Sequence, residues 1–194
     1  MPRPKAFDPD QALDKAMHAF WHKGYEATSV DDLLTAMNIN RGSLYGTFGD
    51  KRELFMKAMD RYCTGGGIGG RLSLLNQPGP ALSLLRRFLE HMLEFGLSDP
   101  QRRGCLITNT VMELAPHEKD IAGKVAERLQ TMEEAFFTLL TRAKEEGELS
   151  QRKDPRALAR FLVTMMQGTI VMIKAGTPAD VVKETAKTAL AILD

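Results

Sequence analysis

The sequence contains only two cysteines, Cys63 and Cys105, among its 194 residues. Two cysteines cannot form the disulfide framework of a small secreted protein, and they fit a reducing compartment. The first ten residues lack the apolar core of a signal peptide, and no apolar run approaches the ~20 residues of a membrane-spanning helix. We therefore expect a complete, cytoplasmic protein.

An excess of charge is also missing. The formal net charge is +1, from 26 Lys and Arg against 25 Asp and Glu, so no global positive field indicates a nucleic-acid partner. A DNA-binding function would depend on locally placed cations, here Arg3, Lys5, Arg41, Lys51 and Arg52. The hydrophobic content of 43% is ordinary for a globular protein with an ample core.

Signatures of catalysis are absent as well. The sequence has no Ser/His/Asp order and no HExxH pattern, and Cys105 with His91 or His117 has no recognisable nucleophile context. The glycine-rich stretch TGGGIGG matches GxGxxG at Gly65, Gly67 and Gly70, but it follows a predicted helix rather than a strand. We expect a connector there and no enzymatic activity or cofactor.

A metal site is conceivable on the first predicted helix, which Asp8 caps and which runs to about Gly24. His18 and His22 lie four residues apart on it, and Asp14 extends the row. No fourth ligand accompanies them and they point away from the buried stripe, so a solvated face is the favoured interpretation and no metal is expected.

The most informative stretch runs from Thr28 to Lys51 and has the pattern of a helix-turn-helix. Ser29 can cap a short helix, with Asp32 three residues on as in a capping box. Asn38 makes the turn, and Asn40 caps a second helix from Arg41 to about Phe48. This second helix is too short and too rich in glycine to be stable alone, so its role is predicted to lie in what it presents outward.

A helical wheel places Leu44 and Phe48 on the inner side of the second helix. Its outer side suits a DNA major groove, because Arg41 can donate to guanine and Thr47 can meet a thymine methyl or a base edge. Lys51, in the first turn of the next helix, is well placed for a phosphate. The predicted DNA-binding residues are Thr28, Ser29, Arg41, Gly42, Ser43, Tyr45, Thr47 and Lys51.

The segments GYEATSVDDLL and MNINRGSLYGTFGDKRELF, with the helix before them, resemble the DNA-binding domain of TetR/AcrR-type bacterial transcriptional regulators. The resemblance covers the first third of the chain. It implies an all-α fold of about nine helices, with a helix-turn-helix domain over residues 1–50 and a helical effector-binding and dimerisation domain over 51–194. Gly46 and Thr47 stand where this family often has an aromatic, His or basic residue, so no operator preference can be transferred.

Periodicity beyond residue 50 predicts only helices. The β-branched run Thr169–Val171 lies inside an apolar segment too long for a strand, which favours a helix there. The expected helices cover about 51–62, 80–96, 102–115, 117–146, 155–176 and 178–193.

The last two helices carry apolar stripes that have two interpretations. The resemblance implies a four-helix interface between two protomers, and the alternative is that both stripes close the monomer's own core. A dimer would hold two recognition helices about 34 to 36 Å apart, matching successive major-groove faces of a pseudo-palindrome. The predicted dimerisation residues are Phe161, Met165, Gly168, Met172, Val182, Ala186, Ala189 and Leu190.

The resemblance also implies a small-molecule effector pocket in the larger domain. Eleven methionines are available for an adaptable cavity, although methionine also simply fills cores. Cys105 follows Arg102, Arg103 and Gly104 near a predicted helix start, a setting that favours a reactive thiolate, with a small buried residue as the alternative. The predicted effector-binding residues are Cys105, Thr108, Asn109, Met112, Glu113, Met132, Phe136, Met166 and Gln167.

Together these features predict a homodimeric DNA-binding transcriptional regulator. The expected mode is repression, relieved by a small-molecule effector or by modification of Cys105. The alternative is a helical small-molecule or protein-binding protein without a DNA function, which the near-zero net charge and the acidic pair Asp31 and Asp32 keep open.

Overall fold

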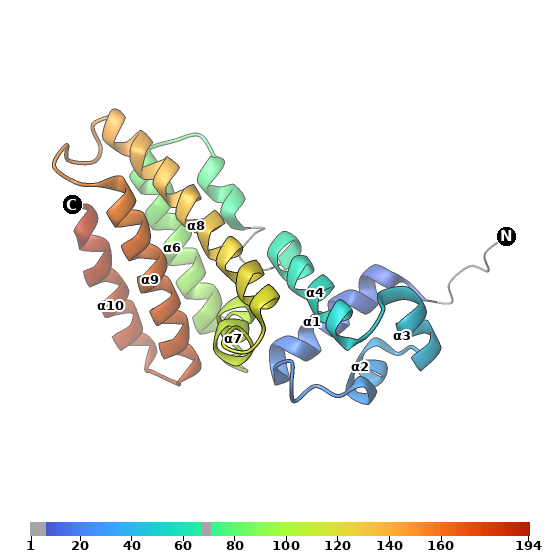
Figure 1. Ribbon diagram of the computed structural model, residues 1–194. Coiled ribbons are helices and arrows are strands. Elements are labelled where there is room, and N and C mark those ends of the chain that lie inside the picture. Colours follow the sequence, from blue (N-terminus) through green and yellow to red (C-terminus); the bar gives the residue numbers. More distant parts are fainter. Residues whose placement is uncertain (1–6, 67–70) are drawn as a thin grey trace. The chain divides into compact units, whose positions relative to one another are not determined.

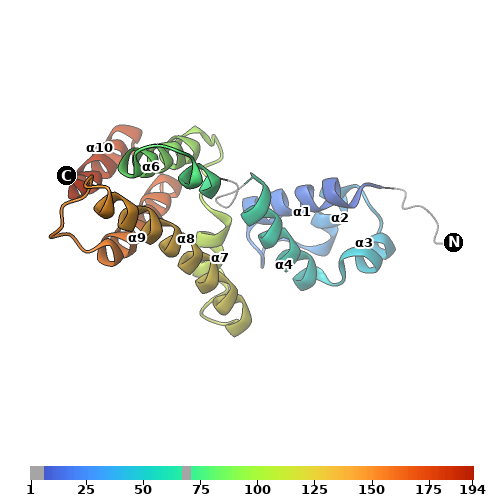
Figure 2. The ribbon, with the colours of Figure 1, turned by 90° about the horizontal axis from the view of Figure 1, so that it is seen from above.

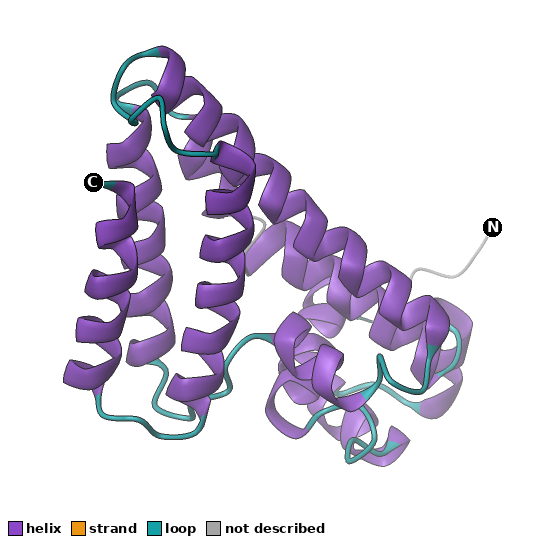
Figure 3. Cartoon of the chain, turned by 60° about the vertical axis from the view of Figure 1, so that its left-hand side comes forward, coloured by secondary structure: helices purple, strands orange, loops and turns teal. Residues whose placement is uncertain are grey.

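The computed structural model describes residues 7–66 and 71–194, and every regular element in these ranges is helical (Figures 1 and 3). The chain divides into two compact units, Met1–Gly69 and Gly70–Asp194. Within the described ranges there are nine α-helices and no strand, which confirms the all-α prediction. The N-terminal arm with Arg3 and Lys5, and Gly67 and Gly70 of the glycine-rich stretch, lie outside the described residues.

The first unit is built around two aromatic contacts. Phe20 packs edge-on against Phe55 with 5.0 Å between ring centroids, and Trp21 meets Tyr62 at 5.1 Å. The guanidinium of Arg61 adds a two-pronged contact, with its Nε and Nη2 donating to the carboxylate of Asp14 at 2.7 and 2.9 Å. The elements are α1 (Pro9–Lys23), α2 (Val30–Met37), α3 (Arg41–Phe48), α4 (Lys51–Arg61) and a π-turn η1 (Tyr62–Gly66).

These contacts place α4 with the first unit. Phe55 and Tyr62 complete the core that Phe20 and Trp21 begin, so by packing the division follows α4 instead of preceding it. The division into domains of residues 1–50 and 51–194 stays a prediction.

The second unit is a helical bundle in which α6, α8, α9 and α10 lie side by side (Figures 1 and 2). Phe88 of α6 packs edge-on against Phe136 of α8 at 5.5 Å, and both rings are fully buried. The elements are η2 (Ser73–Asn76), α6 (Ala81–Ser98), α7 (Leu106–Glu113), α8 (Lys119–Glu145), α9 (Pro155–Lys174), α10 (Ala179–Leu190) and η3 (Ala191–Leu193).

The helix expected at 102–115 begins later than predicted. Arg102 and Gly104 have positive φ angles of 47° and 72°, and a left-handed residue cannot continue a right-handed helix. Cys105 is extended and stands just before α7. The apolar spacing alone did not reveal this interruption, so the predicted start was too early.

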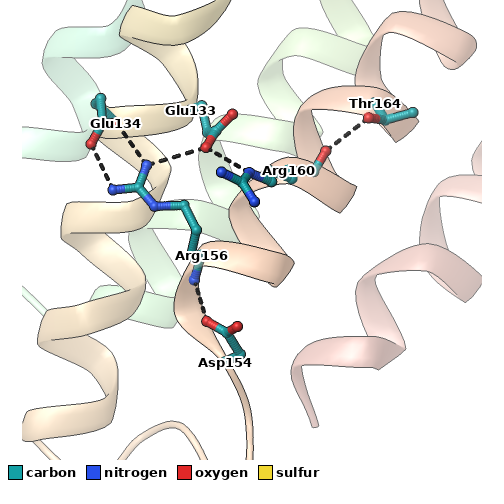
Figure 4. Close-up of polar contacts among 6 residues, drawn as sticks. All are labelled: Glu133, Glu134, Asp154, Arg156, Arg160 and Thr164. Atoms are coloured by element: carbon teal, nitrogen blue, oxygen red, sulfur yellow. Dashed lines mark hydrogen bonds and ion pairs between the residues drawn. The ribbon is translucent and has the colours of Figure 1, made fainter.

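An ion-pair cluster joins α8 to the first turns of α9 (Figure 4). Arg156 reaches Glu133 at 3.2 Å and Glu134 at 2.7 Å, while Nε of Arg160 also lies 3.1 Å from Glu133. The Arg156 guanidinium stacks 3.6 Å from the centroid of the Phe137 ring. The hydrogen bond from Arg156 is the main reason that the pKa of Glu134 lies below the usual value.

By length and composition, α9 is apolar enough to cross a membrane. Arg156, Arg160 and Lys174 interrupt its apolar residues, so α9 does not contain the uninterrupted apolar run that the sequence analysis looked for. In the structure α9 packs against α6, α8 and α10, and core helices of soluble proteins pass the same test.

Candidate nucleic-acid interface

The turn between α2 and α3 is made by Asn38, Ile39 and Asn40, as predicted. Asn38 is left-handed at φ 55°, a conformation that Asn tolerates better than most residues. Asn40 is extended, and its side-chain Oδ1 accepts a hydrogen bond from the amide of Ser43 at 2.8 Å. The amide of Ser43 therefore has a hydrogen-bond partner at the start of α3. The turn fixes the angle between α2 and α3.

The start of α2 is a complete capping box. The amide of Asp32 donates to Ser29 Oγ at 3.0 Å, and the amide of Ser29 donates to Asp32 Oδ2 at 2.9 Å. Lys23 Nζ donates to the same carboxylate at 2.7 Å. This bond first, and the Ser29 bonds next, hold the pKa of Asp32 far below its usual value.

The outer face of α3 matches the predicted pattern. Leu44 and Phe48 are buried, whereas Arg41, Gly42, Tyr45 and Gly46 are exposed, and Ser43 and Thr47 are half-buried. A Cβ added at Gly46 would meet nothing within 4 Å. Packing among the described residues therefore does not require glycine at this position.

Hydrogen bonds from neighbouring residues hold the C-terminal end of α3. Gly49 has a φ of 83°, and a Cβ there would lie 1.6 Å from Glu53 Oε2. That carboxylate accepts from the amide of Asp50 at 3.0 Å, and Asp50 Oδ1 accepts from the amide of Glu53 at 2.8 Å. Lys57 Nζ also donates to the carbonyl of Phe48 at 2.8 Å. These contacts hold a helix that is too short to be stable alone.

Arg41 and Lys51, the two cations in the predicted DNA-binding set, have neighbours that the sequence did not reveal. Arg41 Nη2 lies 2.7 Å from Asp31 Oδ1, with both side chains largely exposed. Lys51 Nζ lies 4.3 Å from the centroid of the Tyr25 ring. The only sequence signal for the first pair was the acidic residue Asp31 on α2, and its distance to Arg41 depends on how α2 and α3 cross.

Thr28 departs from the prediction. Its side chain is fully buried, and its hydroxyl donates to the carbonyl of Gly24 at 2.5 Å. A side chain in that position holds the loop before α2 and does not reach the outer face. Ser29 is exposed, but its hydroxyl is engaged with Asp32.

Asp14, one of the three side chains considered as possible metal ligands, is engaged by an arginine. Asp14 is bound by Arg61, whose hydrogen bond is the main cause that lowers the pKa of Asp14. Within residues 7–66 and 71–194, no group of three or more His, Cys, Asp or Glu side chains could hold a metal ion.

The predicted effector residues separate into a polar contact and a packed core. Thr108 Oγ1 donates to Gln167 Oε1 at 2.6 Å, which joins α7 to α9. Asn109 accepts from Lys174 Nζ at 2.8 Å, and Gln167 Nε2 is buried with no hydrogen-bond partner among the described residues. Glu113 is half-buried at the end of α7.

Met112 was predicted wrongly as a lining residue, because its side chain is 74% exposed. The other apolar members, Cys105, Met132, Phe136 and Met166, are buried in the core. The cavity that Met166 helps to line has a volume of only about 30 Å³, which is close to the volume of one water molecule. Their burial agrees with a core-filling role, and their part in effector binding stays a prediction.

A much larger groove, of about 1080 Å³, runs along α9 and α10. Six of the eight predicted dimerisation residues line it, namely Phe161, Met165, Gly168, Met172, Val182 and Ala189. Ala186 and Leu190 turn the other way and are buried toward the small cavity near α6. Part of the α10 stripe therefore closes the chain's own core, and the face along the groove stays a predicted dimer interface.

Comparisons with known proteins agree with this geometry. Residues 12–58 match the family model "Bacterial regulatory proteins, tetR family", and residues 81–189 match "Tetracyclin repressor-like, C-terminal domain". The chain is 34% identical over 196 residues to the uncharacterised HTH-type transcriptional regulator YezE of Bacillus subtilis (strain 168), covering all of both chains. It is 32% identical to the HTH-type transcriptional repressor ComR of Escherichia coli (strain K12), covering 97% of this chain and 90% of that one.

A solved structure is similar over nearly the whole chain. It contains the TetR family transcriptional regulator CifR, as a cysteine mutant, complexed with a 26-bp double-strand operator DNA. It shares 30% sequence identity with this chain, has a TM-score of 0.89, and covers 99% of this chain and 100% of its own.

Proposed function

The chain belongs to the TetR family of transcriptional regulators, and on this premise we propose that it is a cytoplasmic homodimeric repressor that binds a pseudo-palindromic operator through α3. The observation that carries the proposal is the outer face of α3. This face is largely exposed, is free of acidic side chains and carries small residues, of which Gly46 has nothing within 4 Å of an added Cβ. A face of this kind admits the edges of base pairs at close range.

Local charge supports a DNA partner despite the near-zero net charge. The carboxylate of Asp32 is engaged by Lys23 and Ser29, and that of Asp31 by Arg41. The acidic pair that favoured a protein without DNA function is therefore compensated inside the first unit. The family consists of transcriptional regulators, which agrees with the expectation that the protein is not an enzyme.

The dimer is proposed to form along the groove on α9 and α10. Within the described residues, five of the seven large apolar side chains left exposed lie on α9, α10 or η3, namely Phe161, Val171, Met172, Val181 and Ile192. A contiguous apolar surface of this kind marks an interaction site. An isologous contact pairs this surface with its own copy and gives the twofold symmetry that a pseudo-palindrome requires.

A small-molecule effector or modification of Cys105 is proposed to relieve repression. Cys105 is buried beside the left-handed Gly104, so a reagent reaches its thiol only after the residues that cover it move. An effector changes DNA binding only if it binds the DNA-free form more tightly than the bound form.

The test titrates operator affinity against salt for two variants. Arg41→Ala is expected to relax base preference at one position, with a loss of about 1 to 3 kcal/mol. Lys51→Ala is expected to weaken all sequences alike and to reduce the salt slope by about one. Arg152→Ala, which removes an exposed arginine of the second unit, is the matched control and should bind as wild type does. Unchanged binding in both test variants would refute the site assignment.

A further inference from the structure

The guanidinium of Arg41 has an acidic partner on the preceding helix. Its Nη2 donates to Asp31 Oδ1 at 2.7 Å, which joins the start of α3 to the first turn of α2. The Asp31 side chain is 81% exposed, so its charge reaches whatever DNA Arg41 approaches. A carboxylate there repels every phosphate alike. Asp31 therefore lowers the general affinity for DNA at the point where α3 begins.

Of the two neighbouring acidic residues on α2, Asp31 is the one that serves Arg41. The carboxylate of Asp32 is engaged by Lys23 Nζ at 2.7 Å and by the amide of Ser29 at 2.9 Å. Among the described residues, the ion pair of Asp31 is with Arg41. The two carboxylates thus have separate tasks, because Asp32 holds α2 in place and Asp31 contacts the arginine on α3.

Both residues of the pair stand on backbone that hydrogen bonds hold. Asp31 lies inside the capping box at the start of α2, and its carbonyl accepts from the Thr35 hydroxyl at 2.9 Å. Arg41 is the first residue of α3 and directly follows the cap Asn40. What the contact restricts is therefore the long Arg41 side chain, which loses much rotamer freedom when it is immobilised.

The contact leaves donors for a base. The N–H groups of a guanidinium lie in one plane along several edges, and Asp31 accepts from Nη2 alone. Two neighbouring N–H groups can still donate side by side to O6 and N7 of guanine. A carboxylate that binds one edge sets the plane in which the other edge is presented.

We propose that Asp31 is a positioning residue that determines the specificity of Arg41, an inference that rests on the proposed binding of DNA through α3. With its guanidinium held by Asp31, Arg41 meets guanine at one operator position and keeps the ion pair. To reach a phosphate instead, Arg41 has to leave Asp31. Phosphate contacts carry no sequence information, so the pair withholds Arg41 from binding that does not discriminate.

Two effects of Asp31 can be separated by removing its charge. Asp31→Asn keeps the shape of the side chain and frees Arg41 to turn to phosphates. We expect stronger binding to a non-operator duplex together with a weaker preference for guanine. Loss of repulsion alone would instead strengthen binding to every duplex by the same factor and leave the preference unchanged.

The experiment measures fluorescence anisotropy of the full-length protein on labelled duplexes. The operator is the sequence that wild-type protein selects from a random duplex library, and each variant duplex carries one substituted base pair. Arg41→Ala identifies the base pair that Arg41 reads, where the wild-type preference is expected to be roughly 5- to 150-fold.

At that base pair, Asp31→Asn should lower the preference at least about threefold, within the range for an exposed ion pair. Asp31→Glu keeps the carboxylate and should lower it less. In the Arg41→Ala background, Asp31→Asn should change the preference no further, because the two residues act as a unit.

The matched control is Asp10→Asn. Asp10 is the second residue of α1, as Asp31 is of α2, its side chain is 79% exposed, and it lies 3.6 Å from Arg61 instead of Arg41. The variant removes the same charge from the same helix position and should keep the wild-type preference. Circular dichroism checks that each variant keeps its helices.

The outcomes distinguish this inference from the proposed function. If Arg41→Ala relaxes the preference and Asp31→Asn does not, the positioning role is overturned and the proposed function stands. The same holds if Asp31→Asn strengthens binding to all duplexes equally. If no sequence is selected, or if Arg41→Ala leaves every preference unchanged, both the site assignment and the role of Asp31 are overturned.

Discussion

At the scale of single residues, Lys23 and Asp32 show how side chains far from the outer face fix the helix-turn-helix. The carboxylate of Asp32 closes the capping box of α2 and at the same time accepts from Lys23 of α1. One carboxylate therefore sets both the start of α2 and its attachment to α1. The sequence predicted the capping box, because the spacing of three residues is local, but it did not predict Lys23.

This pairing predicts a pH dependence of stability. The pKa of Asp32 is lower in the folded protein than in the unfolded chain, chiefly because of Lys23. Its contribution is therefore fully present above the unfolded value of about 4 and is lost as pH falls through the lower, folded value. Lys23→Gln should unfold at a lower temperature than wild type near neutral pH, and the difference should shrink as the pH falls below about 4.

The matched control is Lys15→Gln, which removes an exposed lysine from the same helix. Thermal unfolding followed by circular dichroism at several pH values measures both variants. A difference between wild type and Lys23→Gln that stays constant into acid would show that the Asp32 charge is not involved.

Arg41 and Asp31 mark the limit of inference from sequence at this scale. The outward direction of Arg41 followed from the helical wheel and is confirmed, yet its partner on α2 depends on the crossing of two helices. Thr28 fails for the same reason. Its hydroxyl fits a DNA contact by type, and only the folded loop shows that Gly24 already accepts its hydrogen bond.

At the scale of elements, α3 combines a marginal helix with strong end contacts. Gly49 and Gly46 illustrate this, because an added Cβ would meet different surroundings at the two positions. At Gly49 the backbone is left-handed and a Cβ would collide with Glu53, while at Gly46 the space outside is open. The first glycine is required by the fold, and we predict that the second serves contact with DNA.

Substitution by alanine should separate these roles. Gly49→Ala should lower the free energy of unfolding by about 2 kcal/mol, from left-handed strain and a disrupted capping box. Gly46→Ala should raise it by roughly 0.5 to 1 kcal/mol, because alanine is the better helix former, and should nevertheless weaken operator binding. Chemical denaturation and fluorescence anisotropy measure the two effects. A Gly46→Ala protein that binds operator as tightly as wild type would show that α3 does not approach DNA at that point.

The limits of helix prediction appear at α7. The apolar spacing predicted that this helix exists. Its start depends on the left-handed backbone of Arg102, and an arginine in the sequence does not predict that conformation. The starts of α2, α3 and α4 were predicted more closely, because Ser29, Asn40 and Asp50 are N-capping residues that can be recognised from the local sequence.

At the scale of the whole molecule, the apolar groove on α9 and α10 is the feature that a lone chain leaves unexplained. The sequence showed two apolar stripes and could not assign them, since a stripe has the same spacing whether its own core or a second copy covers it. The structure divides the stripes, with Ala186 and Leu190 buried inside and Phe161 and Met172 exposed.

A charge placed in this groove should separate the protomers. Met172→Glu puts a carboxylate into an apolar contact with its own copy, where desolvation and like-charge repulsion cost several kcal/mol, so we expect a monomer. The control is Met112→Glu, at an exposed methionine of α7 outside the groove, which should remain dimeric. Analytical ultracentrifugation measures the mass, and a dimeric Met172→Glu protein would place the interface elsewhere.

The most direct test of the central claim, that a twofold assembly inserts two copies of α3 into one operator, is a titration of wild-type protein against a duplex with both half-sites and against the same duplex with one half-site scrambled. The account predicts two protomers bound per intact duplex and a large loss of affinity when one half-site is scrambled. Equal affinity for both duplexes, or a single protomer on the intact one, would contradict it.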